Sequence, residues 1–369
     1  MAGSASGAVR FDAFMDDALY GLSGFYVRGG RPAARDGDFA TSVELGSLFA
    51  RCVAGYLDRV WHELGKPDPF VVVEGGAGRG TLCCDVLQNV SACRRAVQYV
   101  MVERVERQRA EALERVEALG ADLPVTALAD LPTGPIVGVV LVNELLDNLP
   151  FRLLERAETG WHEVHIQHSQ IATGASRTDE CDGASERQQL QAAAGPAAEV
   201  LLEAPTEAAV MADALAPDAE PGARVPLQLK AAVWVRRALR LLEHGRLLVF
   251  DYGVPATAEL AARPVSEWLR TYRTHRRGYD PLADPGSADI TCEVAFDQLP
   301  PGGSLVTQVD WLAGAGIDDM TAAARSRWQR SRANPTADSL AAQALLDEAA
   351  ALTDPIGMGA FWAAEWRTG

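Results

Sequence analysis

The sequence lacks long hydrophobic runs, and it lacks the pattern of a secretory signal. The longest apolar runs, such as residues 136–142, are far shorter than the roughly 20 residues with which a helix crosses a membrane. No basic segment followed by an apolar one opens the chain. We therefore expect a soluble, cytoplasmic protein with no membrane partner.

Basic residues are also scarce. The 369 residues include 34 Lys and Arg against 50 Asp and Glu, which gives a net charge of −16. Nucleic-acid binding requires clustered cations, so this balance argues against nucleic acid as the main partner. An acidic surface favours solubility, and it also suits a cationic substrate such as an Arg- or Lys-bearing segment.

Cysteine and histidine form no recognisable disulfide or metal pattern. The six cysteines include no C-x-x-C pair, which favours buried free thiols in a reducing compartment. His162, His165 and His168 are spaced by three. On a strand His165 would point away from the other two, and no cysteine or carboxylate completes a ligand set. We therefore predict no metal site.

A glycine-rich stretch follows the first strongly apolar segment. Residues 70–73 are apolar or β-branched and predict a buried strand of a parallel sheet. Glu74 ends that strand, and Gly76, Gly78 and Gly80 follow at alternate positions before an apolar pattern of helical spacing begins. The order of strand, acidic residue, glycine turn and helix places a nucleotide-like ligand at the carboxyl edge of the sheet.

The spacing of these glycines and the carboxylate before them discriminate between ligands. A dinucleotide site uses G-x-G-x-x-G and binds a pyrophosphate, which Glu74 would repel. S-adenosylmethionine has no phosphate, and its amino group, sulfonium and ribose hydroxyls all suit a nearby carboxylate. We therefore predict S-adenosylmethionine as the cofactor, and a nicotinamide dehydrogenase is the least favoured enzyme class. The alternative is a glycine turn without a ligand.

Alternating apolar and helical patterns continue to residue 150 and predict a doubly wound, mostly parallel sheet. The expected strands are 70–73, 97–102, 124–128 and 136–142, and the expected helices are 81–92 and 104–119. Glu103 ends the second strand, where an acidic residue can accept hydrogen bonds from both ribose hydroxyls. Alternatively, Glu103 only opens the next helix. Asp130, after the third strand, is a candidate acceptor for an adenine amino group.

The fourth expected strand ends in a polar cluster. Asn143, Glu144 and Asp147 place three hydrogen-bond-accepting side chains within five residues. Polar groups at the carboxyl end of a central strand face the ligand crevice, so we interpret this cluster as the reaction side of the site. The alternative is that Asn143 and Asp147 cap a turn before Pro150.

The remaining segments predict a cap and an insertion around this core. Helices are expected near 11–22 and 45–64, and a hairpin is expected at 151–168. Further helices are expected near 186–215 and at 229–244, followed by a strand at 246–250 and a polar and aromatic loop near 268–291. A strand at 304–309 and then helices to residue 366 complete the sequence. The predicted division is an N-terminal helical cap (1–69), a core (70–168 and 225–369) and a partly flexible insertion (169–224).

Eight short motifs in register resemble one known family. They are Gly24-Phe25-Tyr26, Gly37-Asp38-Phe39 with Thr41, Ser42 and Glu44, Glu74 through Leu82, Asn143-Glu144 with Asp147, Leu149 and Pro150, Asp251-Tyr252-Gly253, Leu269-Arg270 with Tyr272, Arg273 and His275, Asp289-Ile290-Thr291, and Met358-Gly359 with Phe361. In this order they resemble the MidA-like family of S-adenosylmethionine-dependent methyltransferases, which includes a mitochondrial methyltransferase of complex I assembly. The resemblance covers nearly the whole chain.

This resemblance implies an α/β, Rossmann-like class I methyltransferase fold. Together with the positions after the strands, which single out Glu103 and Asp130, it gives the predicted cofactor residues Glu74, Gly76, Gly78, Gly80, Thr81, Glu103, Asp130 and Asn143. It implies an arginine of a protein as the methyl acceptor, with a respiratory complex I subunit as the candidate substrate. The chain departs from the family pattern at Ala77, at Trp362 and at 225–227, where many members carry a Glu, so its substrate can differ.

The chemistry of an arginine acceptor suggests catalytic residues. A guanidinium has a pKa above about 12 and stays charged at neutral pH. Carboxylates that bind it bidentately orient it and localise its charge. Glu144 is the candidate for this role, with Asp147 and Asp38 as second members.

Two other functions stay open from the sequence. One is a methyltransferase for the oxygen or nitrogen of a small molecule, in which the cap and insertion enclose a pocket. The other is a non-catalytic assembly factor that binds a respiratory subunit and keeps a vestigial cofactor site. The sequence leaves the oligomeric state open, including a homodimer.

Overall fold

The computed structural model describes residues 7–30, 42–120, 122–170, 194–273, 276–278 and 280–369. Asp38, one of the candidate catalytic residues, lies outside the described residues. Residues 171–193 of the predicted insertion also lie outside the described residues.

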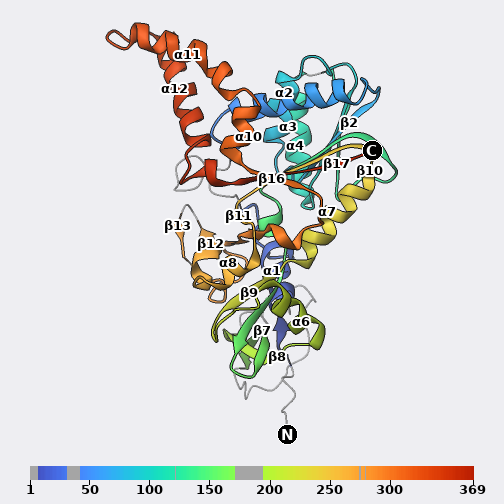
Figure 1. Ribbon diagram of the computed structural model, residues 1–369, viewed down its shortest axis with the longest axis vertical. Coiled ribbons are helices and arrows are strands. Elements are labelled where there is room, and N and C mark those ends of the chain that lie inside the picture. Colours follow the sequence, from blue (N-terminus) through green and yellow to red (C-terminus); the bar gives the residue numbers. More distant parts are fainter. Residues whose placement is uncertain (1–6, 31–41, 121, 171–193, 274–275, 279) are drawn as a thin grey trace, which may run out of the picture.

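A seven-stranded sheet forms the centre of the larger lobe (Figure 1). Its strands are β2 (Phe70–Gly75), β3 (Val97–Val102), β4 (Val125–Leu128), β5 (Ile136–Asn143), β10 (Leu242–Asp251), β16 (Ser304–Thr307) and β17 (Trp362–Thr368). They lie in the order β16-β17-β10-β5-β2-β3-β4, and β17 is antiparallel to both of its neighbours. The other neighbouring pairs are parallel. This confirms the predicted Rossmann-like sheet.

The strand order contains a switch point between β2 and β5. The chain adds β3 and β4 on one side of β2, and then returns to place β5 on its other side. Loops leave the carboxyl ends of such neighbouring strands in opposite directions, which opens a crevice for a ligand. The glycine turn after β2 and the polar cluster after β5 therefore meet at one edge of the sheet.

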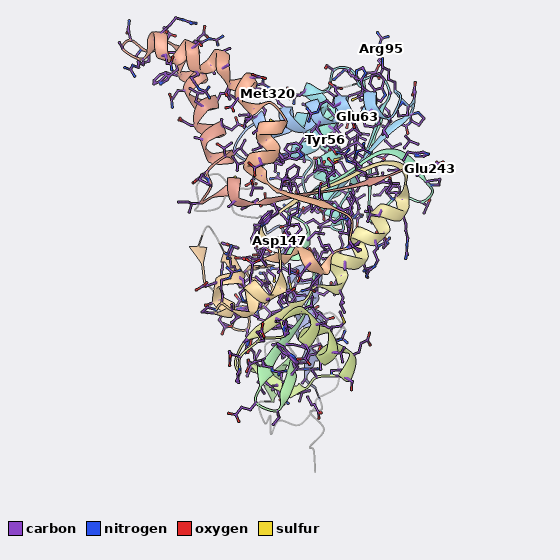
Figure 2. The ribbon with its side chains drawn as sticks, in the orientation of Figure 1. Tyr56, Glu63, Arg95, Asp147, Glu243 and Met320 are labelled. Atoms are coloured by element: carbon purple, nitrogen blue, oxygen red, sulfur yellow. The ribbon has the colours of Figure 1, made fainter. Side chains whose placement is uncertain are left out.

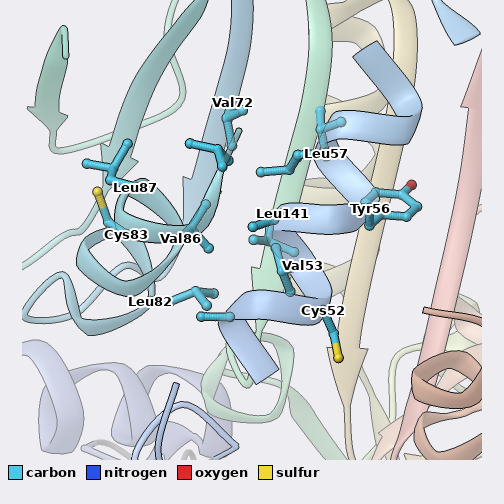
Figure 3. Packing of buried hydrophobic residues seen from close by; sticks show 14 of the residues in the cluster. Cys52, Val53, Tyr56, Leu57, Val72, Leu82, Cys83, Val86, Leu87 and Leu141 are labelled. Carbon is cyan, nitrogen blue, oxygen red and sulfur yellow. The ribbon is translucent and has the colours of Figure 1, made fainter. Parts of the chain in front are cut away.

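Helices cover both faces of this sheet. One face packs against α2 (Leu48–Glu63), α3 (Thr81–Asn89) and α4 (Glu106–Ala118), and the other packs against α7 (Leu229–Leu241). In Figure 3, Val53 and Leu57 of α2 and Leu82 and Val86 of α3 point toward the strands. Because both faces are buried, the strands need continuous apolar runs rather than alternation.

A five-stranded antiparallel sheet forms the smaller lobe at the lower end of Figure 1. Its strands are β1 (Val9–Arg10), β6 (Arg152–Ala157), β7 (Gly160–Gln170), β8 (Ala194–Glu203) and β9 (Arg224–Leu227), and it packs against α1 (Phe11–Tyr20) and α6 (Thr206–Leu215). The predicted hairpin is present as β6 and β7.

The remaining elements join the lobes or project from the larger one. Between the lobes lie β11 (Gly253–Val254), α8 (Thr257–Ala261), α9 (Val265–Trp268), β12 (Leu269–Arg273), β13 (Arg276–Arg277), β14 (Asp289–Cys292), β15 (Val294–Ala295) and a 3-10 turn at Phe296–Gln298. After α10 (Gln308–Gly314), the hairpin of α11 (Ile317–Ser331) and α12 (Ala337–Leu352) projects outward (Figure 1), and a 3-10 turn at Met358–Ala360 leads into β17.

Three local predictions were wrong. The chain ends in strand β17 rather than in a helix, because residues 362–368 fill the position between β10 and β16. In the helix expected near 186–215, residues 194–203 form strand β8, which pairs with β7. The loop expected near 268–291 contains the sheet of β12, β13 and β14. In each case pairing with another strand overrides local preference.

The two helices of the predicted cap lie in different parts of the molecule. α1 packs in the smaller lobe, whereas α2 packs on the central sheet. Residues 152–168 pair with strands from the predicted insertion and its border. The division into cap, core and insertion stays a prediction.

Candidate active site

The glycine turn after β2 lines a cavity at the carboxyl edge of the sheet. Gly76, Gly78 and Gly80 have φ angles of 69°, 53° and 74°, which L side chains rarely adopt. A Cβ on Gly76 would press on Leu145 at 3.0 Å, whereas a Cβ on Gly78 would meet nothing closer than Gln108 at 3.6 Å. Gly78 therefore leaves open the space into which a ligand's atoms can come.

Glu74 lies at the floor of this cavity and is 4% exposed. The Tyr99 hydroxyl donates a hydrogen bond to its Oε2 at 2.8 Å. Burial raises the pKa of Glu74 to about 8, and the Tyr99 hydrogen bond counteracts this effect. A carboxyl with a pKa close to neutral pH is well suited to bind a cationic group, because the cation favours the ionised form of the carboxyl.

Glu103 connects the end of β3 to the glycine turn. Its Oε2 accepts from the Gly78 N–H at 3.0 Å, and its Oε1 accepts from the Val105 N–H at 2.8 Å. Burial raises the pKa of Glu103, and these backbone donors lower it. Each carboxylate oxygen retains a lone pair, so Glu103 can still accept from ribose hydroxyls.

Asp130 is placed differently from the other predicted cofactor residues. Its Oδ2 forms an ion pair with Arg237 at 2.7 Å, and its side chain is 63% exposed. It is not among the described residues that line the cavity. The structure gives its expected contact with adenine no support, and that contact stays a prediction.

Asn143 and Glu144 close the opposite side of the cavity. Glu144 has a φ of 50°, an uncommon conformation for a residue other than glycine. Its Oε1 accepts hydrogen bonds from the Ser42 N–H at 3.1 Å and from the Asn143 side chain at 3.2 Å. Desolvation raises the pKa of Glu144 to about 7. The buried Oδ1 of Asn143 has no hydrogen-bond partner among the described residues.

Three buried aspartates lie beyond Glu144, between the two lobes. Asp147, Asp251 and Asp289 are at most 4% exposed. Asp251 accepts from the N–H groups of Leu146 and Asp147, which fixes the turn that carries Asp147. Figure 2 places Asp147 in the narrow region between the lobes.

Crowding and burial keep these aspartates from ionising freely. Burial raises the pKa of Asp289 to about 7. Burial, together with repulsion from Asp251, Asp289 and Glu144, raises the pKa of Asp147 well above its ordinary value. No described residue forms an ion pair with Asp147, Asp251, Asp289 or Glu144. Glu144, Asp147, Asp251 and Asp289 therefore form a cluster of acids without a counter-charge among the described residues.

The structure brings together most of the residues that the sequence singles out. Glu74, Gly76, Gly78, Thr81, Asn143 and Glu144 line the cavity, while Gly80 opens α3 and packs against Ala112. The sequence interpretation missed Gln108, which lines the cavity from α4. It also gave no role to Tyr26, whose hydroxyl donates to Asp289 at 3.0 Å. The motifs of the family resemblance were the available signal for Tyr26.

These residues fit S-adenosylmethionine. The open space at Gly78, the unpartnered Asn143 oxygen and the two carboxyls of Glu74 and Glu103 supply room, a hydrogen-bond acceptor and negative charge. A phosphate would meet the two carboxyls and be repelled. The donor set therefore matches a ligand that carries cations and hydroxyls rather than phosphates.

A family profile described as "Putative S-adenosyl-L-methionine-dependent methyltransferase" matches residues 52–312. The chain belongs to this family. The match confirms the predicted enzyme class and the predicted cofactor, and it agrees with the family resemblance read from the motifs.

Named relatives and a solved structure extend this comparison. The chain is 26% identical to the mitochondrial protein arginine methyltransferase NDUFAF7 homolog of Drosophila melanogaster, over 79% of this chain and 65% of that protein. It is 26% identical to the Xenopus tropicalis protein, over 85% and 73% of the two chains. A Burkholderia thailandensis protein crystallised with S-adenosyl-homocysteine superposes with a TM-score of 0.77 at 25% identity, over 98% of this chain and 88% of that one.

These comparisons also correct one expectation. The relatives are named as mitochondrial proteins, which overturns the cytoplasmic location expected from the sequence. Among the described residues, no helix is long and apolar enough to cross a membrane.

Proposed function

We propose that this protein transfers a methyl group from S-adenosylmethionine to an arginine of a protein substrate. The observation that carries the proposal is the cluster of four acids, Glu144, Asp147, Asp251 and Asp289, of which Glu144 lines the cofactor cavity. The names of the relatives, protein arginine methyltransferases, support the same acceptor. A complex I subunit is the candidate substrate that the family resemblance supplies.

This cluster of acids suits a guanidinium better than a neutral metabolite. Burial raises the pKa values of Glu144 and Asp289 to about 7, and a bound guanidinium would favour their ionised forms. An apolar substrate would leave the oxygen of Asp147 unpaired and buried, which is unfavourable. The charge of the cluster therefore selects for a cationic acceptor.

In this proposal some residues around the cavity bind the cofactor and others bind the acceptor. Bound S-adenosylmethionine supplies an electrophilic methyl group. Glu74, Glu103, Asn143 and the Gly78 turn hold the cofactor. Glu144 binds the guanidinium and localises its charge away from the attacking nitrogen, with Asp147 as a second carboxylate and Asp38 as a further candidate. Fixing the acceptor in line with the donor supplies much of the rate, since alignment can lower a barrier by about 7–11 kcal/mol.

The backbone around Glu144 is built to keep this carboxyl in place. Ser42 donates its N–H to Glu144, and the Ser42 hydroxyl bonds to Gln308, which is fully buried. Gln308 in turn donates to the Leu352 carbonyl. Segments from both ends of the described chain thereby hold one carboxyl oxygen, as expected for a preorganised group.

A labelling experiment tests the proposal. A proteome is incubated with the enzyme and isotopically labelled S-adenosylmethionine, and the modified residue is located by mass spectrometry. Label on a protein arginine supports the proposal. Label on a small molecule supports the small-molecule methyltransferase instead, and stable binding of a partner without label supports the non-catalytic assembly factor.

A further inference from the structure

Three buried oxygen atoms on the acceptor side lack hydrogen-bond partners among the described residues. They are Oδ1 of Asp147, the hydroxyl of Tyr252 and the hydroxyl of Thr291. Asp147 and Thr291 are 4% and 5% exposed. An unpaired buried oxygen is unfavourable, and native proteins rarely keep one without a functional reason.

These three groups face one another. Asp147 follows the turn that Asp251 fixes, and its neighbour Asn148 donates to Asp289 and to the Ile290 carbonyl, which places the turn against β14. The Tyr252 hydroxyl lies close enough to Asp147 to interact with it and lower its pKa, and the Thr291 hydroxyl does the same to Tyr252. None of these contacts meets the geometry of a normal hydrogen bond, so each oxygen still has room to accept one from a ligand.

The ring of Tyr252 is held in position from two sides. Phe361 packs against it with ring centroids 5.6 Å apart, and the Arg270 guanidinium lies 5.4 Å from the ring centre. Glu293 pairs with Arg270 at 2.6 Å and with Arg263 at 2.5 Å, and it holds the Arg270 guanidinium in place. The Tyr252 ring is therefore fixed in position from both sides.

We propose that Asp147, Tyr252 and Thr291 form the acceptor site, in which their three unpartnered oxygens accept hydrogen bonds from the cationic group that is methylated. A carboxylate and two hydroxyls all accept hydrogen bonds, which matches a group that only donates them, such as a guanidinium or an ammonium. The inference rests on the proposed function and assigns Tyr252 and Thr291 a role in binding the acceptor.

Direct binding to a defined probe tests this site. The protein is saturated with S-adenosylhomocysteine and titrated with an acetylated, amidated Gly-Gly-Arg-Gly-Gly peptide and with its lysine and citrulline counterparts. Citrulline keeps the shape of arginine without its charge. We expect the arginine peptide to bind and the citrulline peptide not to bind. Failure of both cationic peptides to bind would overturn the acceptor site.

Two isosteric variants then test the hydroxyls. We expect Tyr252→Phe and Thr291→Val together to weaken binding of the arginine peptide about tenfold or more, since each removes one hydrogen bond to a charged donor. The affinity for S-adenosylhomocysteine should stay unchanged. Because neither hydroxyl has a partner in the free protein, the melting temperature should stay equal or rise.

Matched controls separate this role from a structural one. Thr368→Val removes another buried hydroxyl without a described partner, at the far end of β17, and should leave peptide binding unchanged. Tyr56→Phe removes a hydroxyl that bonds Glu365 at 2.9 Å and should lower the melting temperature without affecting the peptide. A double variant Tyr252→Phe/Thr291→Val that binds the arginine peptide like wild type overturns the proposal. So does a parallel loss of stability and cofactor affinity.

The outcomes also distinguish this inference from the proposed function. If only the lysine peptide binds, and the same two variants weaken it, the acceptor site stands and arginine is the wrong acceptor. If the wild type methylates a protein arginine but the variants change neither binding nor KM, the proposed function stands and the acceptor site is wrong.

Discussion

On the cofactor side of the active site the protein provides donors for its own acids, whereas on the acceptor side it leaves oxygens unsatisfied. Glu74 accepts from Tyr99, and Glu103 accepts from two backbone N–H groups. Across the cavity, Asp147 keeps a buried oxygen with no partner among the described residues. Glu144, Asp251 and Asp289 do have protein donors, so among the acids of the acceptor side it is Asp147 that is left for a ligand to complete.

The two sides also differ in how the chain builds them. Most of the cofactor side comes from one stretch between β2 and α4, to which Gly30, Val43 and Glu44 add from the N-terminal region and Asn143 and Glu144 from the end of β5. The acceptor side collects Tyr26, Asp147, Tyr252 and Asp289 from four distant segments. A change on one side should therefore leave the other largely intact, and four variants sharpen this separation.

The largest expected effect follows from Glu144→Gln. Glutamine keeps the length of the side chain and the same unusual backbone conformation, but it cannot pair with a guanidinium. We expect kcat to fall about 100-fold, as misplacement of a reacting group does, with cofactor affinity within a few-fold of wild type. Methyl transfer from labelled cofactor and calorimetry measure the two quantities. Near-wild-type transfer would show that Glu144 does not bind the acceptor.

The next effect falls on the cofactor side alone. Asparagine tolerates a positive φ better than other residues, so Gly78→Asn places a side chain in the cavity with little backbone strain. We expect cofactor affinity to fall about tenfold or more, in line with the cost of overfilling a packed space. Gly120→Asn is the matched control, since Gly120 has a φ of 60° and nothing within 4 Å of its Cβ position. Equal affinities of the two variants in calorimetry would contradict a cofactor at Gly78.

A smaller effect should come from Tyr99→Phe. Loss of the hydrogen bond to Glu74 should move the pKa of that carboxyl further above its wild-type value of about 8. Because the ionised carboxylate favours a cationic ligand, cofactor affinity should rise with pH, and its midpoint should shift upward in the variant. Affinity at neutral pH should drop a few-fold. Calorimetry over a pH series measures the midpoint of the change in cofactor affinity with pH. An unchanged midpoint in the variant would show that ionisation of Glu74 does not control cofactor binding.

The smallest effect concerns stability on the acceptor side. Burial raises the pKa of Asp289 to about 7 in the folded protein, against 3.8 for an unperturbed aspartate. The folded state therefore holds a proton that the unfolded state releases, so the stabilising contribution is complete below about pH 4 and is lost as the pH rises to about 7.

Asp289→Asn removes this dependence. Wild type should lose stability as the pH rises from about 4 to about 7, and Asp289→Asn should not lose this contribution. The melting temperature of the variant minus that of wild type should therefore increase by about 2 °C per pH unit over this range. Thermal unfolding at several pH values measures the difference. Parallel curves for the two proteins would mean that Asp289 does not titrate in this range.

The cofactor side could largely be predicted from the sequence, because residues close together in the sequence determine its strand and its turn. The apolar run of β2 must be buried on both faces, and the glycines after it need positive φ angles, so strand and turn are recognisable within a dozen residues. Glu103 could be placed beside the glycine turn for the same reason, at the end of the next strand, and its contact with the cofactor stays a prediction. Asp130 shows the limit of this logic, since its ion pair with Arg237 depends on α7, more than a hundred residues later.

The acceptor side could be predicted only in part. Glu144 and Asp147 follow a recognisable strand. Tyr252 and Thr291 stood out only as members of a polar strand end and of the family motifs, without a predicted contact to the acceptor. Their significance lies in the lack of a partner for a buried oxygen, which depends on how β10, β14 and the turn after β5 pack together. Strand β17 was missed for a related reason, since its position is set by strands that come long before it.

The position of β17 has a consequence for synthesis. One edge of β10 stays unpaired until residues 362–368 have been synthesised, because β17 is its neighbour on that side. Strand β16 likewise has no neighbour other than β17 in the sheet described. An exposed strand edge invites pairing with other chains. While the nascent chain is still emerging from the ribosome, this protein therefore passes through a state prone to aggregation, and shielding by a chaperone at that stage should raise the yield of native enzyme.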